Sequence, residues 1–207
     1  KQELAHQMAL MSKALKRDME VALCQNTAKN AGNASTARQT RSFEAWITTN
    51  KSRGTGGADG SASAAATDAA TGNRRALTEA LLKGVLQSMF TNGAEPKMAI
   101  AGPVNKGVIS GFTGRSNTRQ NVSADTVSAS SSVYASDFGE LQIVPSNRSR
   151  DRSLLLVDPE YAKVAYLRNF QTMDIAKIGD ADTKMILAEY GLEMSNEAAH
   201  GIVADLT

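Results

Sequence analysis

Charged side chains gather at two places in this sequence, and the first is a run of alternating arginines. Arg148, Arg150 and Arg152 lie on either side of Asp151 and Ser149. A guanidinium group can bind a carboxylate or a phosphate through two parallel hydrogen bonds. The run therefore suits ion pairs with a neighbouring subunit, loose contact with packaged DNA, or simply a solvated surface, since exposed charges are common and individually weak.

The second group of charges surrounds a predicted turn between two long strands. It consists of Lys177, Asp180, Asp182 and Lys184. Mixed charge at a protruding turn favours docking in one register over high affinity, because each charge selects an opposite charge on the partner. The turn is therefore a candidate contact between subunits, and the alternative is an ordinary solvated hairpin.

Residue types that support catalysis are present but not in a catalytic arrangement. Asp137–Gly139 matches the metal-binding triplet of protein kinases, yet the other kinase motifs are missing, so a hairpin turn is predicted. His6 and His200 have no ligand-like neighbours at metal spacing. Cys24 is the only cysteine, which excludes an internal disulfide, and it has no neighbouring base. The sequence therefore predicts no catalytic residue, no metal site and no cofactor.

Composition limits the remaining classes of function. The chain has 207 residues, of which 42% are hydrophobic and 21% charged, with a formal net charge of +2. This length can bury one good core or two modest ones. The near-neutral charge argues against a polycation built for nucleic acid. No apolar run reaches the roughly 20 residues of a membrane helix, so no membrane partner is expected.

Hydrophobic periodicity predicts three helices. The longest spans residues 2–25, where Leu4, Met8, Leu15 and Met19 recur at intervals of three and four. A second is predicted at 79–92 after the capping residue Thr78, and a shorter one at 105–112. Helices and strands in this order indicate a mixed α+β fold.

Short apolar runs and alternating patterns predict the strands, which are separated by polar or low-complexity segments. Strands are expected at 97–101, 127–134, 140–144, 154–157, 165–176, 184–194 and 200–206. Residues 113–125 are polar and expected to be exposed. Gly54–Gly72 is rich in Gly, Ala, Ser and Thr, so we expect it to be poorly ordered or held only by contacts with neighbouring subunits.

Several long phrases of the sequence resemble one family of proteins. They are LKRDMEVALCQN (15–26), FEAWITTN (43–50), AGPVNKGVISGFTGRSNTRQNV (101–122), LLLVDPEYAKVAYLRNFQT (154–172), GDADTK (179–184) and AEYGLEMSNEAAHGIVADL (188–206). Together they are similar to the major capsid proteins of tailed bacteriophages, of the Hong Kong ninety-seven type. The likeness covers nearly the whole chain.

This resemblance implies a two-part α+β subunit. A peripheral domain would comprise residues 1–26, the spine helix, and 156–198, the long strands. A compact axial domain would comprise 27–155 and 199–207. The charged turn at Gly179–Asp182 would lie where three capsomers meet. The family has an amino-terminal arm and an extended loop before the spine helix, so we expect that the chain as given is a fragment lacking both.

The resemblance also implies a function. Copies of the protein would assemble in the cytoplasm of a bacterial host into an icosahedral head that encloses phage DNA. Its partners would be other copies of itself, with scaffold, portal or decoration proteins as further candidates and packaged double-stranded DNA contacted without specificity. The alternative is a nucleic-acid-binding or regulatory module that uses the arginine clusters, and salt-dependent retention on DNA would distinguish the two. An enzyme is a third and more distant hypothesis.

Overall fold

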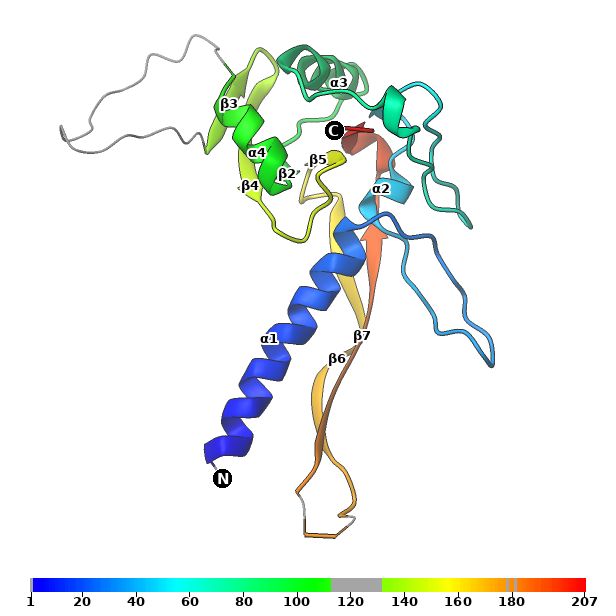
Figure 1. The fold of residues 1–207 in the computed structure, drawn as a ribbon, viewed down its shortest axis with the longest axis vertical. Helices are drawn as coiled ribbons and strands as arrows, with labels where there is room; N and C mark the ends of the chain where they lie inside the picture. Colours follow the sequence, from blue (N-terminus) through cyan, green and yellow to red (C-terminus); the bar gives the residue numbers. More distant parts are fainter. Residues whose placement is uncertain (1, 113–131, 178, 181) are drawn as a thin grey trace, which may run out of the picture.

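The computed structural model describes residues 2–112, 132–177, 179–180 and 182–207. A rounded body contains most of the helices and strands, and two long elements extend from it in roughly the same direction (Figure 1). One is the first helix and the other is a two-stranded hairpin, here called the arm. This division determines which side chains are buried within the chain and which face outward.

The first extended element is α1 (Gln2–Cys24), which confirms the predicted long helix. At 1.5 Å per residue it is about 34 Å long. Its carboxyl-terminal end is embedded in the body, where Met19, Leu23 and Cys24 are buried. Further toward the amino terminus, Leu10 and Met11 are exposed. Most of α1 is therefore not covered by its own chain.

The body is built on a six-stranded sheet in the order β1-β8-β5-β2-β4-β3. The strands are β1 (Asn50–Ser52), β2 (Met98–Ala101), β3 (Val133–Ser136), β4 (Gly139–Pro145), β5 (Ser153–Val157) and β8 (Gly201–Ala204). Every residue of β5 and β8 is buried, because both faces of the sheet are covered there. Strand β1 was not predicted from the sequence, because three residues are too few to show a pattern.

Alternate side chains of β5 enter two hydrophobic clusters on opposite faces of the sheet, as strand geometry requires. Leu154 and Leu156 pack on the face covered by α3 (Glu79–Thr91) and α4 (Pro103–Ser110). Leu155 and Val157 pack on the other face with the end of α1 and with α2 (Phe43–Trp46). The helices therefore sandwich the sheet.

Helix α3 confirms the prediction at 79–92 and lies close to the sheet. The hydroxyl of Thr78 caps the helix by accepting a bond from the Leu81 amide at 3.4 Å. Val85 and Met89 are buried over β8. A Cβ added at Gly201 would lie 2.7 Å from Cγ1 of Val85 and 2.6 Å from Sδ of Met89. Only glycine fits this strand position without displacing the helix.

The arm consists of β6 (Ala162–Asp174) and β7 (Lys184–Met194), which pair antiparallel. It confirms the two long strands predicted from the sequence. The register shifts between Tyr166 and Arg168 and again between Arg168 and Gln171. Such bulges twist a strand and interrupt its pairing. The arm reaches well beyond the body and ends in the charged turn (Figure 1).

The expectation that Gly54–Gly72 is poorly ordered or held only by neighbouring subunits is wrong. The segment is irregular, yet its backbone is bonded to its own chain. The carboxylate of Asp205 accepts bonds from the amides of Gly54 at 2.9 Å and Ala69 at 2.7 Å. The side-chain amide of Asn26 bonds both the N–H and the C=O of Ala66. These polar anchors replace the apolar ones that the segment lacks.

Several other elements begin or end a few residues away from their predicted bounds. Helix α4 begins at Pro103, which suits the first helical turn, and ends at Ser110. The turn predicted at Asp137–Gly139 is confirmed between β3 and β4. Of the strand predicted at 127–134, residues up to 131 lie outside the described residues, as do 113–125. A domain boundary at residue 156 would cut β5, whose last residues Leu156 and Val157 pair within the larger sheet.

Candidate interaction surface

The end of the arm brings together the four charged residues predicted at the turn. Lys177 Nζ lies 2.6 Å from Asp182 Oδ1, and both side chains are 67% exposed. Lys184 Nζ lies 2.8 Å from Oδ1 of Asp174 on the opposite strand. Asp180 is exposed. Gly179 has φ +90°, a left-handed conformation that glycine adopts readily and that lets the chain reverse there.

Because these ion pairs are exposed to water, each contributes little to the stability of the subunit. The end of the arm, here called the tip, therefore carries positive and negative side chains close together, far from the hydrophobic core. Its charges can select a partner whose own charges alternate in the same register.

Exposed apolar side chains accompany the charged tip along the arm. Leu167, at the first bulge, is 77% exposed. The others are Tyr161, Val164, Tyr166, Met173, Ile175 and Met185. Their concentration on one extended element makes the arm a candidate contact site.

Two hollows lie between the arm and neighbouring elements. One, of about 520 Å³, separates the start of α1 from the end of the arm and is lined by Leu4, Met8 and Ile175. The second, of about 490 Å³, lies beside Leu167 and Tyr190 and is also lined by Arg38. Both hollows are open and partly apolar, so a protruding side chain of another molecule can enter them.

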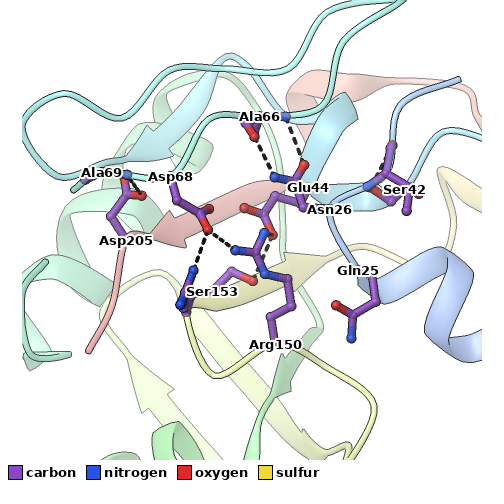
Figure 2. Close-up of polar contacts among 12 residues, drawn as sticks. Gln25, Asn26, Ser42, Glu44, Ala66, Asp68, Ala69, Arg150, Ser153 and Asp205 are labelled. Atoms are coloured by element: carbon purple, nitrogen blue, oxygen red, sulfur yellow. Dashed lines mark hydrogen bonds and ion pairs between the residues drawn. The ribbon is translucent and has the colours of Figure 1, made fainter. Parts of the chain in front are cut away.

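The three alternating arginines do not form one surface. Arg150 points into the body, where its Nη1 lies 3.1 Å from Oε2 of Glu44 and its Nη2 contacts Asp68 (Figure 2). Arg152 Nη1 lies 3.0 Å from Oδ2 of Asp68, and its side chain is 46% exposed. Arg148 is half-buried. Arg150 is therefore an internal ion-pair partner, which its spacing in the sequence did not indicate.

The electrostatics of this cluster follow from burial. Burial raises the pKa of Glu44, and the positive charges of Arg150 and Arg53 offset this effect only in part. Burial alone would also raise the pKa of Asp68, but hydrogen bonds and charge from Arg152 and Arg150 outweigh it and lower the pKa. The hydroxyl of Ser153 donates to Glu44 at 3.1 Å. The cluster fixes α2 and the 54–72 segment to the start of β5.

A second polar clamp lies where β7 leads into β8. The carboxylate of Glu197 accepts bonds from the backbone N–H groups of Thr48 and Thr49, at 2.5 and 2.8 Å, and from the Thr49 hydroxyl at 2.7 Å. Burial acts to raise the pKa of Glu197, but these bonds outweigh it and lower the pKa. Neither Glu44 nor Glu197 was a candidate from the sequence, because a single glutamate carries no signal of its distant partner.

The described residues offer no recognisable catalytic arrangement. Cys24 is buried, and burial raises the pKa of its thiol to about 11, so the nucleophilic thiolate is scarce at neutral pH. Among these residues no three His, Cys, Asp or Glu side chains are grouped so that they could hold a metal ion. Within the same part of the chain, no helix is both long and apolar enough to cross a membrane.

Comparison with known proteins gives one match over the full length. The sequence model of the family described as SU10 major capsid protein matches residues 1–207. No curated protein matches. One similar solved structure is the crystal structure of a virus-like particle from Pyrococcus furiosus, with 14% identity and a TM-score of 0.40. The match covers 62% of this chain and 52% of that chain, so the present chain spans about half the length of that protein.

Proposed function

The chain belongs to the SU10 major capsid protein family, and on this basis we propose that copies of it assemble into the icosahedral head that encloses phage DNA. The match over residues 1–207 is the observation that carries the proposal. The protein is then a structural component of the virion. Its assembly takes place in the cytoplasm of the bacterial host, and it needs no catalytic residue and no cofactor.

The extended shape of the subunit supports this role. Helix α1 and the arm present exposed apolar side chains, such as Met11 and Leu167, that the chain itself does not cover. In a shell, neighbouring copies cover them, and burial of apolar surface stabilises the contact by about 25 cal/mol per Å². Many copies of one modest contact, related by symmetry, then give a stable closed particle.

The presence of two separate sheets supports different roles for two parts of the subunit. With the boundary moved past β5, the peripheral part comprises residues 1–26 and 158–198 and makes contacts between capsomers, while the axial part comprises 27–157 and 199–207. The tip residues Lys177, Asp180, Asp182 and Lys184 set the register of the peripheral contacts. Of the arginines, Arg152 is the best placed for a neighbouring subunit because its side chain is the more exposed.

Scaffold, portal or decoration proteins and packaged double-stranded DNA are further proposed partners. Contact with DNA is non-specific in this proposal, and the net charge of only +2 makes it weak. A dedicated nucleic-acid-binding module is less well supported, because Arg150 is paired with Glu44 and Asp68 inside the body. Retention of the unassembled protein on DNA-cellulose that weakens steeply as the salt concentration rises would favour that alternative.

Electron microscopy of the full-length product tests the proposal. We expect closed shells of uniform size for the wild type. A variant with Leu167→Lys and Ile175→Lys should yield folded subunits but few shells, because both charges are placed on the uncovered face of the arm. As a matched control, Gln87→Lys places the same charge on an exposed residue of helix α3 in the body and should leave the shells intact. Wild-type protein that stays monomeric at high concentration would contradict the capsid role.

A further inference from the structure

The arm continues a strand pair of the body after a short interruption. In the body β5 pairs with β8 as far as Leu156 and Gly201. In the arm the same two stretches of chain resume pairing at Ala162 and Met194. Residues 157–161 and 195–200 form the interruption, here called the neck. The chain crosses from body to arm and back only through the neck. The neck bonds therefore help to set the direction of the arm, together with the packing of Tyr190, Leu192 and Met194 on the body.

A histidine side chain supplies one of the bonds that the interrupted strand pair lacks. The Asp158 amide donates to Nδ1 of His200 at 3.2 Å, on the body side of the neck. On the arm side, the Ser195 amide donates to the carbonyl of Tyr161 at 2.9 Å. His200 is fully buried. Because Nδ1 accepts a bond, the imidazole is neutral there and carries its proton on Nε2.

The surroundings of His200 hold it in place from several elements. The side-chain amide of Asn50 donates to its carbonyl at 3.0 Å, and the ring of Phe43 lies edge-on with centroids 6.3 Å apart. Its backbone amide bonds the carbonyl of Glu197 at 3.0 Å. The two hydrogen bonds fix the His200 backbone beside Asp158, and the Phe43 ring packs against the imidazole itself.

Charged groups lie near His200 on both segments of the neck, 157–161 and 195–200. Asp158 is buried, and Lys97 Nζ lies 3.8 Å from its Oδ1, with Glu160 on the outer side of Lys97. Glu197 lies on the second segment of the neck, 195–200. Burial lowers the pKa of His200, and the Asp158 charge, the Tyr161 backbone and the Glu197 charge oppose this effect without cancelling it. The neutral form is therefore the one that the folded neck favours.

We propose that His200 is an acid-sensitive latch that fixes the arm to the body while its imidazole is neutral and releases the neck when it is protonated. A proton on Nδ1 turns the acceptor into a donor, and it then faces the Asp158 N–H, which is also a donor. The bond is lost, and the imidazolium is drawn toward the Asp158 carboxylate instead. The neck loosens while the six-stranded sheet stays folded.

This regulatory role rests on the proposed capsid function, because a change in arm direction matters to the extent that the arm contacts other copies. Acid would then change the angle between body and arm in every subunit of a shell. The latch itself is a property of the single subunit. It can be tested without any shell, so failure of the latch and failure of the capsid role give different results.

Hydrogen exchange of the unassembled protein provides the test, with His200→Asn as the non-titrating variant and His6→Asn as the control. The Asn side chain can accept the Asp158 bond but does not titrate, and His6 is exposed on α1. After correction for intrinsic rates, we expect neck protection relative to α3 to fall about tenfold from pH 7.5 to 5.0 in wild type and His6→Asn. In His200→Asn it should stay constant.

Three outcomes would overturn the latch. They are neck protection in wild type that does not change with pH, an equal change in His200→Asn, or loss of protection in the neck and α3 together. If His200→Asn does not fold, nuclear magnetic resonance of the wild-type protein still tests the latch. The imidazole nitrogens and the Asp158 amide should then shift with one midpoint on acidification, and an imidazole that remains neutral to pH 4 would refute the proposal.

Discussion

Glu44 and Arg150, separated by more than a hundred residues in the sequence, form an ion pair inside the body with Oε2 and Nη1 3.1 Å apart. The Glu44 side chain is 1% exposed and that of Arg150 is 13% exposed. The pair joins α2 to the segment before β5, and Asp68 extends it to the 54–72 segment. A buried pair of this kind holds distant parts of a chain in one arrangement because neither charge can return to water without cost.

Removal of one partner should therefore be costly. Arg150→Met leaves the Glu44 carboxylate buried and unpaired, and we expect the free energy of unfolding to fall by about 3 kcal/mol. Arg152→Met removes a more exposed charge from the same cluster and should cost less than about 1 kcal/mol. Urea unfolding of both variants at pH 7 measures the difference. Equal losses would show that Arg150 acts as a surface charge.

The bonds from Asp205 predict a local effect on the 54–72 segment. Asp205 has φ +60°, a conformation that Asn also tolerates. Asp205→Asn keeps this conformation but leaves one side-chain acceptor for the two amides of Gly54 and Ala69, so stability should fall by about 1–3 kcal/mol. Hydrogen exchange should increase at these two amides and remain unchanged in the arm. Unchanged exchange at both would mean that other contacts hold the segment.

The Glu197 clamp predicts that the stability of the fold falls at low pH. Its bonds to Thr48 and Thr49 lower the pKa from the ordinary value of 4.5. The clamp therefore stabilises the fold fully above about that pH, and the stabilisation is lost as the pH falls through the lowered pKa. Urea unfolding of wild type and Glu197→Gln should differ at pH 6 and converge toward pH 3. The exposed residue Glu95, changed to Gln, serves as the control and should show no such convergence.

Periodicity in the sequence was enough to find the longest helix and strands. Helix α1 and the strands β6 and β7 have long patterns, so their types and approximate bounds were predicted correctly. The charged turn was found because its residues are neighbours in the sequence as well as in space. In each case the signal is local, and a pattern of three to ten residues carries it.

Contacts between distant segments left no such local signal. Asp205 and Gly54 are 151 positions apart, and neither is unusual in its own surroundings. The small residues Ala66 and Ala69 are buried in an otherwise low-complexity run, which composition alone assigns to disorder. Arg150 looked like its neighbours Arg148 and Arg152 until the fold placed Glu44 beside it. These are properties of tertiary packing, so sequence patterns could not have located them.

The packing of α3 on the sheet predicts a strong effect of a buried charge. Val85 is 2% exposed and lies against Gly201. Val85→Asp should lower the free energy of unfolding by roughly 2–4 kcal/mol, because the carboxylate has no partner in this apolar cluster. Gln87→Asp introduces the same group on the exposed side of the helix and should cost less than about 1 kcal/mol. A wild-type melting temperature for Val85→Asp would contradict the observed packing.

The tip of the arm predicts a variant that folds but does not assemble. Asp180→Lys with Asp182→Lys removes the partner of Lys177, yet that pair is two-thirds exposed, so the melting temperature of the isolated subunit should change by no more than a few degrees. If the tips of neighbouring copies converge as proposed, like charges would then meet there, and the yield of particles should fall sharply. Glu160→Lys, which breaks an exposed pair with Lys97 away from the tip, provides the matched control and should leave the yield unchanged. Differential scanning calorimetry and particle counts by electron microscopy separate the two effects. A normal yield for the tip variant would refute the assembly role of the tip, whereas a large loss of subunit stability would mean that the tip supports the fold itself.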